Sequence, residues 1–196
     1  MSASKRELVF ATNNPHKLEE IRRIAGDAIR ILSLDDIGCH DDIPETADTL
    51  EGNSLIKARW VKDRYGKDCF ADDTGLLVDA LDGRPGVMSA RYAGPECSPD
   101  DNMNLLLKEM EGIADRKARF VTVITLIEAD TIRQFRGEVA GKIALERDGN
   151  SGFGYDPIFI ADESGISFAS MTPDAKNSIS HRGRATRQLI DHLLRD

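Results

Sequence analysis

Cys69-Phe70-Ala71-Asp72-Asp73-Thr74-Gly75 is an apolar run that ends in two adjacent carboxylates and a Thr-Gly pair. The apolar part predicts a strand buried inside a sheet, and the glycine predicts a turn directly after the carboxylates. Ligands of α/β sheets bind at the carboxyl edge of the strands, where such a turn would lie. Neighbouring carboxylates repel each other unless a cation or a proton compensates them. The segment therefore indicates a Mg²⁺-assisted site or, alternatively, a polar turn that caps the next element.

The sequence on either side of residues 69–75 alternates between strand and helix patterns. Strands are predicted at residues 7–11, 29–32, 67–72, 119–127 and 131–139, and helices at residues 15–25, 50–65, 99–111 and from 181 onward. The first helix has clear end signals, because Asn14 can cap it, Pro15 fits its first turn and Gly26 can end it. This order predicts a single α/β domain over residues 1–196, with a mixed central sheet flanked by helices and a cleft between two lobes.

Composition restricts the class of protein and its partners. Of the 196 residues, 31% are charged, and the formal net charge of −8 disfavours binding of long nucleic acids. The chain has no apolar run long enough to cross a membrane, and residues 1–6 lack the apolar core of a signal peptide. The three cysteines are widely spaced and fit neither a metal motif nor a disulfide framework. We therefore predict a cytoplasmic protein with reduced thiols that binds neither membranes nor nucleic acids.

The first strand-to-helix junction, at residues 12–17, has the features of an anion site. Free backbone N–H groups and the helix dipole favour a phosphate there. Thr12 and Asn14 add polar side chains, and Lys17 adds a positive charge one turn into the helix. The glycines of a Walker A loop are absent. The alternative is an ordinary capped helix with a solvated lysine.

Glu45 and Lys57 are the residues that would complete a site around the aspartate pair. Glu45 lies in a polar, irregular stretch. A loop carboxylate that meets strand carboxylates makes a hard oxygen site suited to Mg²⁺. Lys57, on the predicted helix at residues 50–65, would reach the same cleft. For both residues the alternative is a solvated surface position.

Two later segments carry groups that suit a purine base. Phe153 lies between two glycines and is a stacking platform, and Asp156 can accept hydrogen bonds from the edge of a base. The alternative for this segment is a glycine-rich turn before a strand. Lys176, His181 and Arg182 are donors near the start of the last helix, where they suit a carbonyl oxygen or a phosphate. The alternative for them is a basic first turn.

Taken together, these groups are the ones that a nucleotide site requires: hydrogen-bond donors for phosphates, carboxylates for a metal, an aromatic ring that stacks on the base and hydrogen-bonding partners for its edge. The sequence shows no Ser-His-Asp set and no cysteine with a basic neighbour. Metal-assisted hydrolysis with water as the nucleophile is therefore the predicted chemistry.

Five motifs of the chain resemble those of the Ham1-type inosine triphosphatases. They are residues 11–17, 71–76, 85–92, 153–157 and 180–183, which occur in the family's order and span nearly the whole chain. The resemblance implies a homodimeric enzyme with an elongated mixed sheet and an active-site cleft between two lobes. It also implies Mg²⁺-dependent cleavage of ITP, dITP and XTP to the monophosphate and pyrophosphate, which would keep these nucleotides out of DNA and RNA.

The resemblance further implies roles for individual residues. Asp73 is the implied proton acceptor and a metal ligand, Glu45 is a second metal ligand, and Asp72 is the alternative base. Lys57 is an additional candidate from its predicted position. The implied substrate-binding residues are Thr12, Asn13, Asn14, Pro15, His16, Lys17, Thr74, Phe153, Gly154, Tyr155, Asp156, Lys176, His181 and Arg182. Asn13 departs from the family pattern, because many members have glycine there, which affects how closely the backbone approaches the phosphates.

Discrimination between purines is expected at the 6-position. Hypoxanthine and xanthine carry a carbonyl there, to which His181 and Arg182 can donate. The amino group of adenine would leave those donors unpaired, which a hydrogen-bonding site rejects strongly. Guanine shares the 6-carbonyl, so its rejection must come from the 2-amino side.

Three other functions fit parts of the sequence. They are a Maf-like pyrophosphatase that acts on other non-standard nucleotides, a nucleotide-binding regulator without turnover, and an interaction scaffold. The aspartate pair together with Glu45 favours catalysis, because binding alone does not require them. Release of pyrophosphate from ITP with Mg²⁺ separates a catalyst from the last two.

Overall fold

The computed structural model describes residues 6–195, which form two units. The first unit contains residues 6–73, 122–137 and 182–195, and the second contains residues 74–121 and 138–181. Two units agree with the two predicted lobes, whereas the single functional domain and the cleft stay predictions. Residues 1–5, part of the segment expected to lack a signal peptide, lie outside the described residues.

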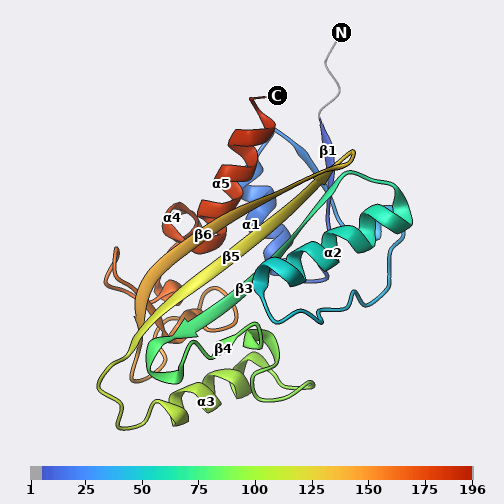
Figure 1. Ribbon diagram of the computed structural model, residues 1–196. Coiled ribbons are helices and arrows are strands. Elements are labelled where there is room, and N and C mark those ends of the chain that lie inside the picture. The colour runs from blue at the N-terminus through green and yellow to red at the C-terminus, as the bar shows by residue number, and fades with distance from the viewer. Residues whose placement is uncertain (1–5, 196) are drawn as a thin grey trace. The chain divides into compact units, whose positions relative to one another are not determined.

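Strands and helices alternate in the first part of the chain, up to β3, and the strands β5 and β6 follow each other directly, as Figure 1 shows. The strands are β1 (Glu7–Phe10), β2 (Arg30–Leu32), β3 (Cys69–Val78), β4 (Pro85–Gly86), β5 (Lys117–Glu128), β6 (Thr131–Ile143) and β7 (Phe159–Ala161). The α-helices are α1 (Pro15–Ala25), α2 (Leu50–Tyr65), α3 (Pro99–Glu109), α4 (Pro173–Ile179) and α5 (His181–Leu193). The short helix α4 was not predicted; Thr172 caps it, and a proline occupies its first turn.

The strands belong to one mixed sheet with the order β2-β1-β3-β5-β6-β7, and β4 pairs with β3. β1 runs parallel to both β2 and β3, whereas β4 is antiparallel to β3 and β7 is antiparallel to β6. The long strands β3, β5 and β6 contribute residues to both units. The predicted α/β fold with a mixed sheet flanked by helices is therefore confirmed.

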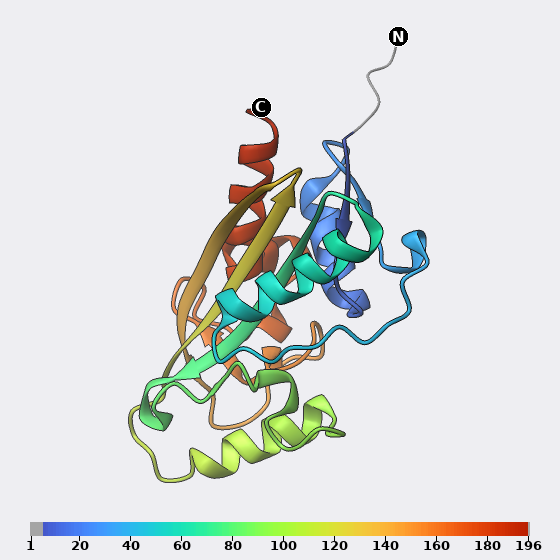
Figure 2. The same ribbon diagram turned by 45° about the vertical axis from the view of Figure 1, so that its right-hand side comes forward.

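In the first unit, side chains that alternate along the strands form one core on each face of the sheet. Phe10 and Phe70 stack at a centroid distance of 4.7 Å on the face covered by α1 and α5. Val9 and Ala71 belong to the core on the opposite face, against which α2 packs (Figures 1 and 2). β1 and β3 are neighbouring parallel strands between these two cores. The loop that follows β1 therefore lies next to the middle of β3.

In the second unit, α3 packs against the far half of β3. Ser98 caps α3 in a capping box, and the buried side chains of the helix include Met103 and Leu106. These side chains share one core with Leu76 and Val78 of β3. Met103 and Leu106, three residues apart, therefore lie on the face that α3 buries.

The turn predicted after the aspartate pair is wrong. β3 continues through Thr74 and Gly75 to Val78, so Asp72 and Asp73 lie in the middle of a strand. Gly75 does not adopt the positive φ that would turn the chain. The strand continues because apolar side chains resume after it and are fully buried in the second unit's core.

Two compositional predictions are tested by the structure. All three cysteines are free thiols, as predicted. Within residues 6–195, no helix combines the length and apolar character needed to span a bilayer.

Candidate active site

Asp72 is a buried carboxylate held between two cations in the first unit. Its Oδ1 accepts from Lys17 Nζ at 3.0 Å, and its Oδ2 accepts from Arg182 Nε at 3.3 Å. Burial alone would raise the pKa of Asp72, but the charges of Lys17 and Arg182 outweigh burial and hold that pKa well below its ordinary value. Asp72 is therefore ionised at neutral pH, and it ties α1 and α5 to β3.

Arg182 has a second carboxylate partner, which the sequence did not predict. Its Nη1 donates to Glu20 Oε2 at 2.5 Å, and its side chain is only 3% exposed. Glu20 lies on α1 about one turn after Lys17, and that helical spacing was the available signal. The predicted role of Arg182 as a donor to a purine carbonyl stays a prediction.

Asp73 lies next to Asp72 but has different surroundings. Its Oδ1 accepts from Lys57 Nζ at 3.1 Å, and its Oδ2 accepts from Asn53 Nδ2 at 3.3 Å. Burial raises the pKa of Asp73 above its ordinary value, although Lys57 and Lys17 oppose the change. A carboxylate whose pKa is raised is the better proton acceptor near neutral pH, so Asp73 suits a catalytic base better than Asp72 does.

Glu45 meets Asp73 through Lys57. The segment at 38–49 runs alongside α2 in both ribbon views (Figure 2), and Lys57 Nζ donates to Glu45 Oε1 at 2.5 Å. Lys57 is only 7% exposed, so the solvated alternative for this residue is wrong. The reason is that the buried face of α2 contains Asn53 and Lys57 as well as apolar residues.

The carboxylate oxygens around Lys57 are suitable ligands for a hard divalent cation. Two carboxylates, Glu45 and Asp73, converge on one position that the ammonium group of Lys57 now occupies. Within the described part of the chain, no cluster of three or more His, Cys, Asp or Glu side chains could hold a metal by itself. Mg²⁺ is usually bound by one or two carboxylates together with water and substrate phosphates, so two protein carboxylates are sufficient.

The predicted cap of α1 is confirmed. Asn14 Oδ1 accepts from the backbone N–H groups of His16 and Lys17 at 3.0 and 3.2 Å, and Thr12 Oγ1 accepts from the N–H of Asn14 at 3.2 Å. Pro15 occupies the first turn, and it is exposed, as are Asn13 and His16. The predicted binding of phosphate by residues 12–17 stays a prediction.

In the second unit, Asp156 organises the loop that carries Phe153. Its Oδ2 accepts from the Phe153 backbone N–H at 2.8 Å and from Lys176 Nζ at 2.7 Å. Lys176 Nζ also lies 4.9 Å from the centroid of the Phe153 ring. Asp156 and Lys176 are both buried, so this ion pair fixes the ring in place.

Other residues predicted for the base site have structural contacts of their own. Tyr155 belongs to the core, where its hydroxyl donates to the carbonyl of Ser89 at 2.9 Å. His181 stacks on Phe120 at a centroid distance of 4.5 Å. Thr74 is half-buried in β3. Their predicted roles toward the substrate stay predictions.

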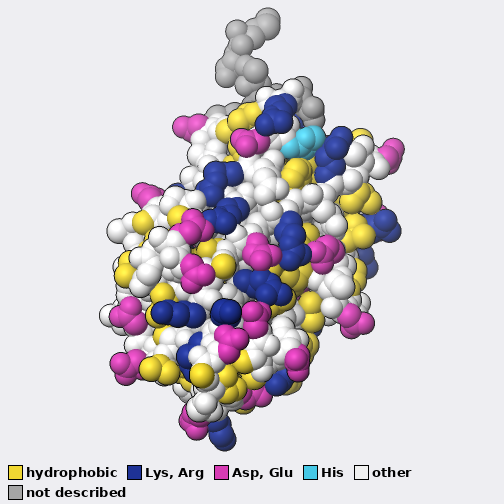
Figure 3. Space-filling view, turned by 60° about the vertical axis from the view of Figure 1, so that its left-hand side comes forward, with side chains coloured by type: hydrophobic (Ala, Val, Ile, Leu, Met, Phe, Trp, Pro, Cys, Tyr) yellow, Lys and Arg dark blue, Asp and Glu magenta, His cyan; other side chains and the backbone are white. Residues whose placement is uncertain are grey.

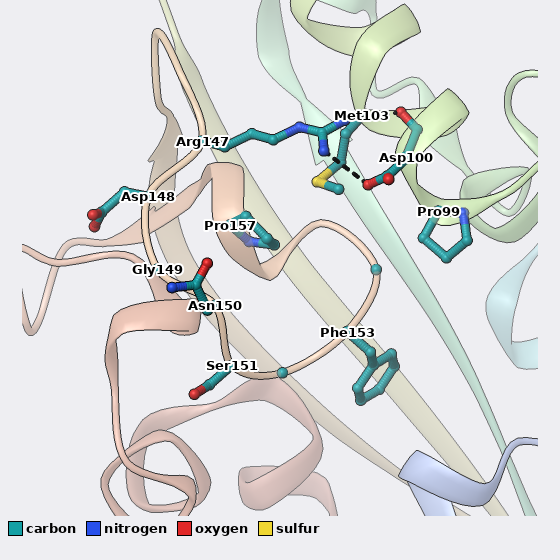
Figure 4. Close-up of a pocket in the computed structure, with 12 residues that line it drawn as sticks. Pro99, Asp100, Met103, Arg147, Asp148, Gly149, Asn150, Ser151, Phe153 and Pro157 are labelled. Atoms are coloured by element: carbon teal, nitrogen blue, oxygen red, sulfur yellow. Dashed lines mark hydrogen bonds and ion pairs between the residues drawn. The ribbon is translucent and has the colours of Figure 1, made fainter.

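A pocket of about 600 Å³ in the second unit adjoins the Phe153 loop. Its walls come from the start of α3 and from residues 147–157. Figure 4 shows the ion pair between Arg147 and Asp100 at one side, and Phe153 at the far end of the loop. The charge of Arg147 is therefore already neutralised on the pocket wall, which leaves Phe153 as its aromatic surface.

Gly152 is required for the Phe153 loop to close on Asp156. Its φ is +80°, and a Cβ at this position would lie 2.1 Å from Asp156 Oδ2. Gly152→Ala is expected to displace Asp156 and raise the KM for dITP about tenfold, while kcat changes less because the first unit is untouched. Steady-state kinetics measures both constants.

Gly154→Ala is the matched variant, because Gly154 has a φ of +62° and nothing within 4 Å of its Cβ position. Equal effects of the two variants would contradict the predicted contact.

Comparison with known proteins gives one consistent result. The Ham1 family matches residues 8–192. A Porphyromonas gingivalis protein named dITP/XTP pyrophosphatase is 54% identical over 189 residues, which cover 96% of this chain and 97% of that protein. A Flavobacterium johnsoniae protein of the same name is 53% identical over 187 residues, with 95% and 97% covered. The solved structure of a HAM1 protein from Coxiella burnetii has a TM-score of 0.90 at 36% identity and covers 97% of this chain and 100% of its own. The chain belongs to the Ham1 family.

Proposed function

We propose that this protein hydrolyses the purine nucleoside triphosphates ITP, dITP and XTP to the monophosphate and pyrophosphate, with Mg²⁺. Relatives more than half identical to the chain are named dITP/XTP pyrophosphatase, which supports this substrate class. The observation that carries the proposal is the pair of carboxylates, Glu45 and Asp73, around the ammonium group of Lys57. A protein that only bound nucleotides would not need two carboxylates that converge on one position.

Different residues of the chain have separate roles at the triphosphate. Asp73 orients a water and accepts its proton as the water attacks a phosphorus of the α–β anhydride, whose bridging P–O bond breaks to give the monophosphate and pyrophosphate, and the raised pKa of Asp73 favours this proton transfer. Lys17 and Lys57 bind phosphate oxygens. Glu45 and Asp73 would hold the Mg²⁺ ion, which would neutralise charge that develops on those oxygens. Asp72 keeps Lys17 and Arg182 in position.

Three residues of the second unit, Phe153, Lys176 and His181, and Arg182 of the first unit act on the purine in this proposal. Phe153 stacks on the base, and Lys176 stands beside the ring as a hydrogen-bond donor. His181 and Arg182 donate to the 6-carbonyl, which hypoxanthine and xanthine share. Adenine is rejected because its amino group would leave these donors unpaired.

The remaining parts of the proposal concern assembly and partners. By resemblance to its family, the protein acts as a cytoplasmic homodimer. Its net charge is −8, and on the face in Figure 3 basic side chains are interspersed with acidic ones. Long nucleic acids are therefore not proposed as partners, because their binding relies on neutralisation of phosphates by Lys and Arg.

A panel of nucleoside triphosphates tests the proposed function. With Mg²⁺, we expect kcat/KM for dITP and XTP to exceed that for ATP by at least about 10²-fold, with monophosphate and pyrophosphate as products. Products are separated by anion-exchange chromatography. Release of inorganic phosphate instead of pyrophosphate, or preference for ATP, would contradict the proposal. A clear preference for non-purine nucleotides would favour the Maf-like alternative.

A further inference from the structure

Asn53 is a fully buried amide on α2 that contacts the proposed catalytic aspartate. Its Oδ1 accepts from the backbone N–H of Ala47 at 2.8 Å, and its Nδ2 donates to Asp73 Oδ2 at 3.3 Å. The residue has no exposed surface. A buried amide is destabilising unless both of its ends are paired, so these two bonds fix its orientation.

The two partners of Asn53 determine which residue type fits there. The N–H of Ala47 can only donate, and the ionised carboxylate of Asp73 can only accept. An amide satisfies both groups at once. A carboxylate at position 53 would accept from Ala47 but would repel Asp73, and an apolar side chain would leave both partners unpaired.

The bond to Ala47 also fixes the loop that carries Glu45. Ala47 is two residues after Glu45, and the loop lies close against α2 at this point. A Cβ on Gly52 would lie 2.6 Å from the Cβ of Ala47, so a side chain at position 52 would push the loop away. Gly52 therefore allows the loop to lie against α2, and Asn53 holds the loop there and orients Asp73.

We infer that Asn53 is a positioning residue for the proposed metal site, where it sets the orientation of Asp73 and the place of Glu45 without contacting the substrate. This inference rests on the proposed function, because it assumes that these two carboxylates hold the divalent cation. Partners of this kind, one bond removed from a metal, typically change metal affinity or activity by 10–100-fold. Lys57 contacts the same two carboxylates, but as a charge that a cation would displace or share, whereas Asn53 is neutral.

Two substitutions separate the functions of the amide. Asn53→Ala removes both hydrogen bonds. Asn53→Asp keeps the acceptor for Ala47 and replaces the donor to Asp73 by a carboxylate, so it tests the contact with Asp73 alone.

Asn102 on α3 provides a matched control. It is also buried, and its Oδ1 accepts from the backbone N–H of Ala93 at 2.8 Å. Its Nδ2 donates to the backbone carbonyl of Ala90 at 3.1 Å, not to a carboxylate. Asn102→Ala and Asn102→Asp therefore change the same type of buried loop contact where the partners are backbone groups.

The readouts are Mn²⁺ binding, measured by the EPR signal of the free ion, and steady-state kinetics with dITP. Asn53→Ala is expected to weaken Mn²⁺ binding by about 10–100-fold, and Asn53→Asp to lower kcat by about 10–100-fold with little change in KM. The Asn102 variants are expected to lower the unfolding temperature while both readouts stay within about twofold of wild type. The inference is overturned if the Asn53 variants lose only thermal stability, as the Asn102 variants do. It is also overturned if wild type binds Mn²⁺ no more tightly than Asp73→Asn.

Turnover by the wild type reports on the proposed function separately. A wild type that does not cleave dITP, but whose Mn²⁺ binding depends on Asn53, would contradict the function and support the inference. A wild type that cleaves dITP, with Asn53 variants that match the Asn102 variants, would support the function and overturn the inference.

Discussion

Asp73→Asn is expected to lower kcat for dITP by about 10³-fold, because a positioned proton acceptor contributes roughly 10²–10⁴-fold to a reaction of this kind. The substitution keeps the size of the side chain and its contact distances but removes the group that accepts the proton. The amide nitrogen of the variant cannot accept from Lys57 or Asn53, but burial makes the charged form of Asp73 unfavourable and raises its pKa, which offsets part of this loss, so the variant is expected to fold. The rate of pyrophosphate release at saturating Mg²⁺ and dITP measures the loss.

The control for Asp73→Asn is its thermal unfolding, which is expected to lie within a few degrees of wild type. A folded variant with near-normal turnover would rule out Asp73 as the base. In that case the assignment would pass to Asp72, although Asp72 is held ionised by Lys17 and Arg182.

The parts of the fold that the sequence predicted well are those whose signals are local. The first turn of α1 was predicted from Asn14 and Pro15 because capping and ring geometry involve residues only a few positions apart. Gly66 likewise ends α2 at the predicted residue, in the left-handed conformation that glycine adopts easily. The carboxylates themselves were found because two adjacent aspartates after an apolar run are unusual in any sheet.

The parts that were missed depend on contacts between distant segments. Gly75 was expected to turn the chain, but whether a glycine bends a strand depends on the packing of the residues after it, here Leu76 and Val78. Asn53 gave no signal and Glu20 only its helical spacing from Lys17, because a polar residue on a helix is usually solvated. Only the packing of their helices against β1 and β3 shows which carboxylate or cation each one meets. Residues that hold a catalytic group in place are therefore harder to predict than the group itself.

Asp72→Asn is expected to destabilise the protein by about 3 kcal/mol at pH 7, because it leaves the buried Arg182 and the partly buried Lys17 without their shared carboxylate. For a chain of this length, that loss lowers the unfolding temperature by about 6–12 °C. Differential scanning calorimetry measures the change. Catalytic activity of the fraction that stays folded should fall less than in Asp73→Asn, since the proton acceptor remains. Equal stability of Asp72→Asn and wild type would show that the two cations find other partners.

The pH dependence separates Asp72 from its neighbour. The pKa of Asp72 in the folded protein lies below its ordinary value of 3.8, so its contribution to stability is fully present above about pH 5 and is lost as the pH falls further. The stability difference between wild type and Asp72→Asn should therefore stay constant from pH 7 to about pH 5 and shrink below pH 4. Asp73 has the opposite shift, so Asp73→Asn should lose less stability at pH 7 than Asp72→Asn does. A difference for Asp72→Asn that is unchanged at pH 3 would show that the aspartate acts through packing and not through its charge. Burial raises the pKa of both carboxylates, and their partners decide whether it is outweighed: Asp72 accepts from two cations, whereas Asp73 shares one cation with Glu45 and is buried beside a neutral amide.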